Sequence, residues 1–251
     1  MPSEPTTHPL PLTGERTLPG VAEENYWFRR HEVAYRYAAA RCAGVDVLDA
    51  GCGEGYGTAL LAEAARRSVG VELVADVHAH AVAAYPEAEF VQADLCDLPL
   101  PDASFDVVVS FQVIEHLPNI GGYLSEIDRI LRPGGTFLCA TPNRLTFTPD
   151  SDTPVNPFHV IEFAPAELTD LLGRVFAVGT LLGVRHGSAI QAIEVEHGRP
   201  FTDLVLDTPP ADWPGWLADA VAAIGVDDFP ITDTDLDTSL DLLAVARKEP
   251  L

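Results

Sequence analysis

The sequence predicts an α/β protein built around a doubly wound, largely parallel sheet. Three observations support this fold class: short apolar runs alternate with helical patterns, the turns between them are short, and one strand passes through glycines directly into a helix. The 251 residues are enough to bury the core of one such domain. We expect that domain to span residues 21–251, after a flexible, proline- and threonine-rich tail over residues 1–20, of which residues 10–16 could instead lie along the folded body.

The first expected element is a helix over Glu23–Arg41 that approaches the first strand. It carries five aromatic side chains together with Arg29, Arg30 and Arg36. Two interpretations stay open. Either the aromatic rings pack against the sheet while the arginines are solvated, or residues 21–44 form a lid with an arginine over a ligand site.

The segment Val45–Thr58 is the one that organises the chain. Its strand ends in Asp49-x-Gly51-x-Gly53-x-Gly55, and a helical pattern follows. Such a turn directs backbone N–H groups and the positive end of a helix dipole at one spot, which suits a nucleotide-like ligand. A dinucleotide fingerprint would need its third glycine where Tyr56 stands, so a pyrophosphate is not the expected ligand.

Later strands bring acidic residues to the same edge of the sheet. Glu72 lies near the end of a strand over Ser68–Leu73, where a carboxylate can bind ribose hydroxyls, and Asp94 follows a strand over Ala88–Gln92. An insertion over residues 186–239 precedes the last strand and holds a helix near Trp213–Ile224. The remaining elements are expected to be helices over Ala59–Arg67, Ala75–Ala84, Ile120–Leu131 and Pro165–Arg174, and strands over Phe105–Phe111, Thr136–Thr141, Val178–Val184 and Leu240–Ala246.

Composition restricts the partners and the compartment. The net charge of −23 would repel a phosphate backbone, which argues against nucleic-acid and anionic-membrane partners. No apolar run is long enough to span a bilayer. The four cysteines show no C-x-x-C spacing and look like reduced thiols, so we expect a cytoplasmic protein. The oligomeric state is left open.

Five motifs in this order resemble those of class I S-adenosylmethionine (SAM) dependent methyltransferases: V-L-D-A-G-C-G-E-G-Y-G, V-G-V-E-L, F-V-Q-A-D-L, S-F-D-V-V-V-S-F-Q-V-I-E-H-L and L-R-P-G-G-T-F-L-C-A-T-P-N-R. The resemblance implies a Rossmann-like sheet of seven strands, with the glycine turn around the methionine part of SAM and the Asp94 carboxylate on the adenine amine. The residues expected to bind the cofactor are Asp49, Gly51, Cys52, Gly53, Gly55, Tyr56, Glu72, Leu73, Asp94, Leu95, Phe111, Gln112 and Arg30.

A second resemblance covers most of the chain. The runs L-T-G-E-R-T-L-P, E-N-Y-W-F-R-R-H-E-V, D-T-P-V-N-P-F-H and D-x-S-L-D-L-L-A-V-A look like those of actinobacterial sugar O-methyltransferases that act in the synthesis of methylated glucose or mannose polysaccharides. This implies methyl transfer to a hydroxyl of a sugar or short oligosaccharide. The alternatives are a methyltransferase of another small molecule, such as a quinone precursor or natural product, and a SAM-binding protein without catalysis.

A sugar hydroxyl is weakly acidic and gains from a base that removes its proton as the new bond forms. His159, in the loop after the fifth strand, is the predicted base, with His116 as its rival and Glu115 beside it. Relatives that act on quinone precursors have a second Glu where Gln112 stands, and Gln is a poorer ligand for a hard cation. No metal is therefore predicted, although a site made by Glu115, His116 and His159 is conceivable.

The predicted sugar-binding walls combine aromatic rings, which pack against the C–H faces of sugars, with an amide for their hydroxyls. These residues are Tyr26, Trp27, Phe158 and Asn143. Any of the rings could equally belong to the core.

Overall fold

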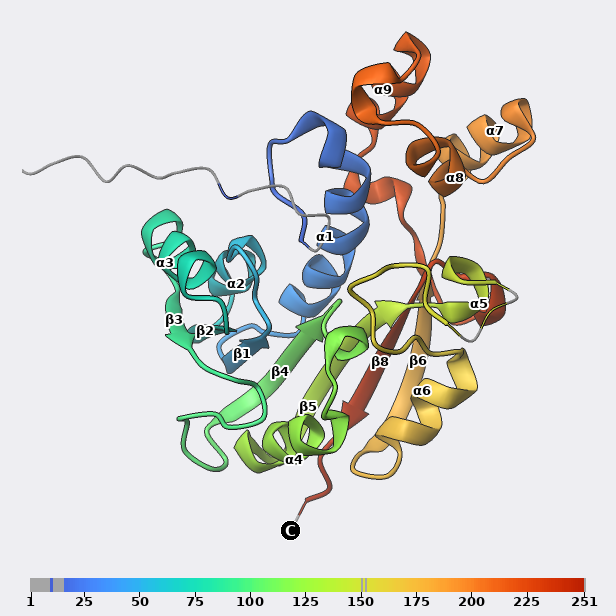
Figure 1. Ribbon diagram of the computed structural model, residues 1–251. Coiled ribbons are helices and arrows are strands. Elements are labelled where there is room, and N and C mark those ends of the chain that lie inside the picture. Colours follow the sequence, from blue (N-terminus) through green and yellow to red (C-terminus); the bar gives the residue numbers. More distant parts are fainter. Residues whose placement is uncertain (1–9, 11–15, 150, 152, 251) are drawn as a thin grey trace, which may run out of the picture.

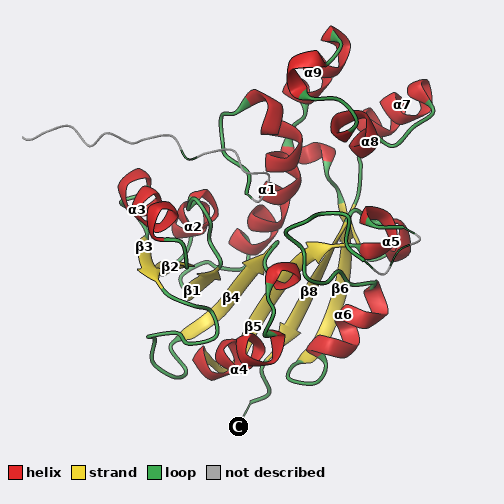
Figure 2. Ribbon diagram, viewed as in Figure 1, coloured by secondary structure: helices red, strands yellow, loops and turns green. Residues whose placement is uncertain are grey.

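An α/β sheet forms the centre of the protein, as Figures 1 and 2 show for the computed structural model, which describes residues 10, 16–149, 151 and 153–250. The strands are β1 (Asp46–Ala50), β2 (Arg67–Glu72), β3 (Glu89–Gln92), β4 (Phe105–Phe111), β5 (Leu131–Pro142), β6 (Ala177–Val184), β7 (Ile231–Thr232) and β8 (Asp241–Arg247). Their order is β3-β2-β1-β4-β5-β8-β6-β7. Strands β1 to β5 pair in parallel, whereas β8 runs antiparallel between β5 and β6. The predicted doubly wound α/β fold is confirmed.

Two details of the sheet differ from the prediction. The sheet has eight strands rather than seven, because the two-residue β7 adds an edge to β6. Strand β5 also begins earlier than Thr136. The preceding helix ends at Ile130, Leu131 already pairs with Phe105, and the Pro-Gly-Gly run forms an irregularity before Thr136 pairs with Val107. Glycine and proline end the helix as expected, but the chain stays within the sheet.

Helices cover both faces of the sheet (Figure 1). On one face, α1 (Asn25–Ala39) and α2 (Tyr56–Ala62) pack on β1 and β4, and α3 (Ala75–Ala84) lies beside α2. On the other face, α4 (Ile120–Ile130) and α6 (Pro165–Leu172) pack on the sheet through buried leucine and isoleucine side chains. None of the helices in the described ranges is long and apolar enough to cross a membrane.

The insertion folds into a helical cap above one end of the sheet, drawn in orange in Figure 1. It contains α7 (Ser188–His197), α8 (Phe201–Leu206) and α9 (Gly215–Ala223), so the single predicted helix is only one of three. Tyr26 of α1 is fully buried among the apolar side chains of this cap. The remaining elements are α5 (Arg144–Phe147) and the 3-10 turns Ala22–Glu24, Ile114–His116, Pro210–Asp212, Val226–Asp228 and Leu236–Thr238.

The N-terminal tail is described only in part. Of the residues expected to be flexible, 1–9 and 11–15 lie outside the described residues. Thr17 is 9% exposed and so belongs to the folded body. Residues 16 and 17 line the cavities described below, so this end of the segment lies along the folded body.

The contact between α1 and α2 depends on a glycine. A Cβ at Gly57 would lie 2.2 Å from the ring of Tyr35, so only a glycine lets α2 approach α1 this closely. We predict that Gly57→Ala lowers the free energy of unfolding by about 1–3 kcal/mol through overpacking. Urea denaturation measures this quantity.

Gly121 of α4 provides the matched control, since a Cβ there meets nothing within 4 Å. Gly121→Ala should leave stability unchanged or raise it by up to about 1 kcal/mol. Equal destabilisation by both substitutions would show that the contact between Gly57 and Tyr35 is not the cause.

Candidate functional site

Two adjoining cavities open where the parallel strands end at their carboxyl edge. The first has a volume of about 220 Å³ and the second of about 290 Å³. Their sizes suit two small molecules, or parts of them, held side by side. The residues that line both cavities, and so mark their junction, are Arg16, Thr17, His31, Gln112 and His116.

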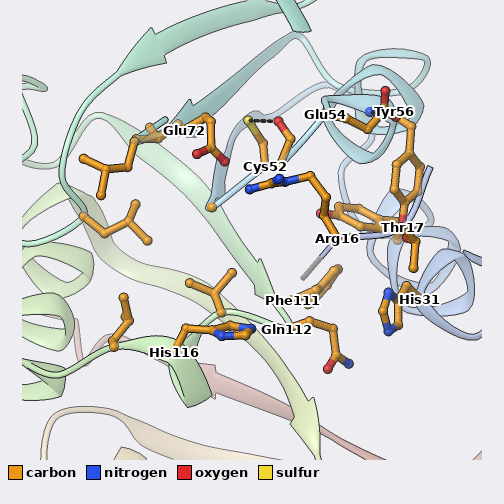
Figure 3. A pocket seen from close by; sticks show the side chains of 18 of the residues that line it. Arg16, Thr17, His31, Cys52, Glu54, Tyr56, Glu72, Phe111, Gln112 and His116 are labelled. Carbon is orange, nitrogen blue, oxygen red and sulfur yellow. Dashed lines mark hydrogen bonds between the residues drawn. The ribbon is translucent and has the colours of Figure 1, made fainter. Parts of the chain in front are cut away.

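The glycine turn between β1 and α2 forms one wall of the first cavity (Figure 3). Gly51 has φ +86°, and a Cβ there would lie 2.5 Å from a methyl carbon of Val113. The turn therefore exposes backbone to the cavity without side chains in between. Cys52, Gly53 and Tyr56 also line this cavity, as predicted. Gly55 does not, because a Cβ there would point at Tyr85 and Ala81 instead.

Asp49 supports the turn from beneath and does not line either cavity. Its carboxylate is fully buried, and it accepts hydrogen bonds from the hydroxyls of Thr58 at 2.7 Å and Tyr35 at 3.2 Å. Burial raises the pKa of Asp49 to about 7, although these two hydrogen bonds act in the opposite direction. Asp49, which was predicted to bind the cofactor, therefore orients the glycine turn and does not itself line a cavity.

The two other acidic residues lie where the sequence placed them. Glu72 and Asp94 both line the first cavity, beside Leu73 and Leu95. Glu72 accepts a hydrogen bond from the N–H of Val74 at 2.8 Å, and Asp94 accepts one from the N–H of Cys96 at the same distance. Each carboxylate is therefore oriented by the turn that follows its own strand.

Gln112, at the end of β4, lines both cavities in a strained backbone conformation. Its φ is +57°, which is uncommon outside glycine, and its side-chain amide donates to Asp241 at 3.3 Å. Phe111 beside it lines the first cavity. Both were predicted, but the strain leaves no signal in the sequence.

Arg30 does not reach the first cavity. Its guanidinium forms a two-pronged ion pair with Asp241, with N–O distances of 2.6 and 2.7 Å, and donates to the carbonyl of Leu240. Burial lowers the pKa of Arg30, but the Asp241 carboxylate outweighs it and the net shift is upward. Arg30 instead lines the second cavity, so its predicted contact with the cofactor does not match its position.

Several residues of the first cavity had not been predicted. Arg16 and Thr17 reach it from the supposed tail, and Figure 3 shows the Arg16 side chain extending toward Cys52 and Glu72. His31 lies at the junction, where burial lowers its pKa to about 4. The L-T-G-E-R-T run of the sequence was the one available signal for Arg16. The remaining unpredicted lining residues are Tyr35, Glu54, Val71, Val113 and Leu117.

The three predicted catalytic residues meet in the second cavity. One potential ligand atom from each of Glu115, His116 and His159 lies within 4.8 Å of the other two. The Nδ1 of His159 lies 2.7 Å from Glu162, and its Nε2 lies 3.0 Å from the side-chain amide nitrogen of Asn156. Burial lowers the pKa of the His159 ring, and His116 lowers it further against the opposing effect of Glu162.

Glu115 is the buried member of this group. One carboxylate oxygen accepts a hydrogen bond from the Thr141 hydroxyl at 2.9 Å, whereas the other, Oε1, has no partner among the described residues. Burial raises the pKa of Glu115 to about 8. His116 donates from Nδ1 to the carbonyl of Phe158 at 2.9 Å if it carries its proton there.

Of the predicted sugar-binding walls, only Trp27 lines the second cavity. Tyr26 is buried in the cap, where its hydroxyl lies 2.8 Å from His186. Asn143 is also buried, and its amide donates to the carbonyls of Leu236 and Ser239. Phe158 is 42% exposed outside both cavities. None of these three residues lines either cavity, because Tyr26 is packed in the cap, the Asn143 amide is bound to backbone carbonyls and Phe158 lies at the surface. The lining residues that the sequence did not reveal are Glu24, Pro142, Phe147, Asn156 and Leu206.

Residues 48–139 match a family model described as "Methyltransferase domain". The chain is 53% identical to a probable S-adenosylmethionine-dependent methyltransferase of Mycolicibacterium smegmatis, over 94% of this chain and 95% of that one. It is 46% identical to a protein of the same description from Mycobacterium tuberculosis, over 98% and 93% of the two chains.

Among solved structures, a SAM-dependent methyltransferase from Thermotoga maritima, described as a possible histamine N-methyltransferase, matches with a TM-score of 0.62. The match covers 90% of this chain and 95% of that one at 18% identity. At this identity the likeness concerns the fold alone.

The buried Asp49 carboxylate predicts a pH dependence of stability. Its folded-state pKa, about 7, lies above the ordinary value of 3.8, so its favourable contribution is complete below pH 3.8 and is lost as the pH rises through 7. Asp49→Asn should remove this loss, which amounts to at most about 1.4 kcal/mol per pH unit in that window. Urea denaturation from pH 4 to 8 measures the difference in slope between wild type and variant.

The exposed Asp76→Asn is the control, and its slope should equal that of the wild type. Parallel pH profiles for Asp49→Asn and the wild type would contradict the assignment of the titration to Asp49.

Proposed function

The chain belongs to the SAM-dependent methyltransferases, and from this premise we propose that it transfers the methyl group of SAM to a hydroxyl of a sugar or short oligosaccharide. The observation that carries the proposal is the pair of cavities, which meet at His116 and Gln112 with a cluster of titratable side chains just beyond. SAM is the cofactor, and the first cavity has the features that it needs. The second cavity is left for the acceptor.

The residues of the first cavity fit SAM. The glycine turn presents backbone to the methionine part, and a side chain at Gly51 would need Val113 to move. The Glu72 carboxylate is assigned to the ribose hydroxyls and the Asp94 carboxylate to the adenine amine. Arg16 lines this cavity whereas Arg30 lines only the second, so Arg16 is the better placed partner for the methionine carboxylate.

Bound SAM supplies a methyl group that is already activated for in-line displacement. The work left to the protein is to hold the acceptor oxygen close to that carbon and to take up its proton. Trp27 and Asn156 line the second cavity and offer a ring face and an amide to a sugar. The walls are polar and aromatic together, which supports a sugar over a purely apolar acceptor.

His159 is the proposed base. With its Nδ1 proton donated to Glu162, the lone pair on Nε2 is directed at the amide of Asn156. An acceptor hydroxyl that displaced this amide would give its proton to Nε2. Because burial lowers the pKa of His159, the ring is neutral at pH 7 and ready to accept a proton. Glu162 orients the ring and would stabilise its charged form.

Two rival functions remain distinct from this proposal. The first is methyl transfer to another small molecule, and the second is SAM binding without catalysis. Incubation of labelled SAM with a panel of gluco- and manno-oligosaccharides, methylated and unmethylated, tests all three. Label in a sugar supports the proposal, whereas label only in other small molecules, or in no acceptor, favours one of the rivals.

For the base, we predict that His159→Ala lowers kcat by about 10²–10⁴-fold, the usual contribution of general base catalysis. Binding of S-adenosylhomocysteine, measured by isothermal titration calorimetry, should not change, because His159 lies outside the first cavity. His197→Ala, which alters an exposed histidine of α7, is the control for both measurements. A small effect of His159→Ala together with a large one of His116→Ala would move the base to His116.

For the cofactor, we predict that Glu72→Ala weakens the binding of S-adenosylhomocysteine by about 10–150-fold. Hydrogen bonds to a charged group contribute about 1.5–3 kcal/mol, which corresponds to this range. Calorimetry gives the dissociation constant, and Glu196→Ala on the exposed side of α7 serves as the control. An unchanged affinity in Glu72→Ala would contradict the assignment of Glu72 to the ribose.

A further inference from the structure

We propose that Glu115, His116 and His159 bind one divalent cation of the transition-metal class. The three residues come from two segments, the turn Ile114–His116 after β4 and the loop before α6. Their potential ligand atoms lie within 4.8 Å of one another, and all three side chains line the second cavity. The inference concerns binding and does not imply that methyl transfer requires a metal.

The hydrogen bonds of the two histidines are those expected of metal ligands. His116 directs Nδ1 at the backbone carbonyl of Phe158, and His159 directs Nδ1 at the carboxylate of Glu162. Metal-binding histidines usually donate the second ring N–H in this way, which fixes the tautomer and raises the basicity of the other nitrogen. In both rings this leaves Nε2 as the ligand atom.

Glu115 supplies an independent observation. Its side chain is 0% exposed, and its Oε1 has no hydrogen-bond partner among the described residues. A buried carboxylate oxygen without a donor is costly, and either a proton or a cation can satisfy it. A cation next to the two imidazoles does so without any further donor from the protein.

The backbone holds the two ligand-bearing segments together. The carbonyl of Glu115 accepts hydrogen bonds from the N–H groups of Val160, at 2.7 Å, and Ile161, at 3.2 Å. These residues follow His159 directly, so the loop cannot move away from Glu115 without breaking both bonds. The rings of His116 and His159 are packed edge to face, with centroids 5.0 Å apart.

The ligand set indicates the class of cation. Two imidazoles and one carboxylate suit zinc, manganese, iron or cobalt rather than magnesium, which prefers oxygen ligands. Ligands about 2.1 Å from a tetrahedral ion lie roughly 3.4 Å apart, so the most widely spaced atoms of the cluster must approach by up to about 1.4 Å. The Asn156 amide, which now donates to His159, must also turn away.

The coordination positions of a bound cation that no protein ligand fills would face the second cavity. Because Nε2 of His159 cannot hold the cation and accept a proton at once, a bound cation would exclude the proposed general-base step, and this last link alone rests on the proposed function. The binding of the cation does not, because it can be measured without any acceptor. A failed search for methylated sugars would leave it intact, and the absence of metal binding would leave the methyl transfer intact.

The test uses untagged full-length protein in chelator-free buffer, titrated with Co²⁺ and followed by visible absorption and calorimetry. We expect the wild type to bind a single equivalent with the absorption bands of a site of low coordination number. Glu115→Gln and His159→Ala should abolish these bands. Glu162→Gln, which changes only the partner of His159, should weaken binding by about 10–100-fold. Asn156→Ala should strengthen it, because the competing amide is gone.

His197→Ala is the matched control and should bind Co²⁺ as the wild type does, since this histidine lies on the exposed surface of α7. A thermal shift with S-adenosylhomocysteine shows that each variant is folded. The proposal is overturned if the wild type shows no Co²⁺ bands, or if Glu115→Gln and His159→Ala, still shifted by S-adenosylhomocysteine, bind Co²⁺ like the wild type.

Discussion

The buried carboxylate of Asp49 is the constraint on which the ligand-binding edge depends. It lies at the end of β1 and accepts hydrogen bonds from Tyr35 of α1 and Thr58 of α2. One side chain therefore joins α1, the strand β1 and the helix α2 that follows the glycine turn. Burying it is unfavourable to its charged form, as its raised pKa shows. The hydrogen bonds from Tyr35 and Thr58 offset part of this cost, and they fix the position of the glycine turn between β1 and α2.

The fold and much of the lining of the first cavity could be predicted because their signals are local. Glycines with a positive φ, apolar strands and acidic residues after strands are readable within a few positions, and Glu72 and Asp94 do line the first cavity. The positions of the other predicted site residues depend on contacts between segments that lie far apart in the sequence. Tyr26 and Asn143 look like binding residues in the sequence, but in the structure they form hydrogen bonds with the distant residues His186 and Ser239. The three cap helices and the inward course of residues 16 and 17 depend on such contacts too.

The two cavities are built from different kinds of structural element. The first is built mainly from turns that directly follow parallel strands, where backbone geometry is fixed by the sheet. The second is lined in large part by residues of α1, of the loop before α6 and of α8 in the cap. Relatives with the same sheet can therefore share a cofactor and still accept different molecules, because insertions and loops vary more readily than strands.

The ion pair between Arg30 and Asp241 has a consequence for how the protein is made. It joins the first helix to the last strand across 211 positions of the chain, and β8 must enter the sheet between two strands that precede it. A ribosome has to deliver the chain from α1 through β8 before either event can occur. A nascent chain can thus pair β1 to β5 early, but the Arg30–Asp241 ion pair beside the second cavity forms only after β8 has been synthesised.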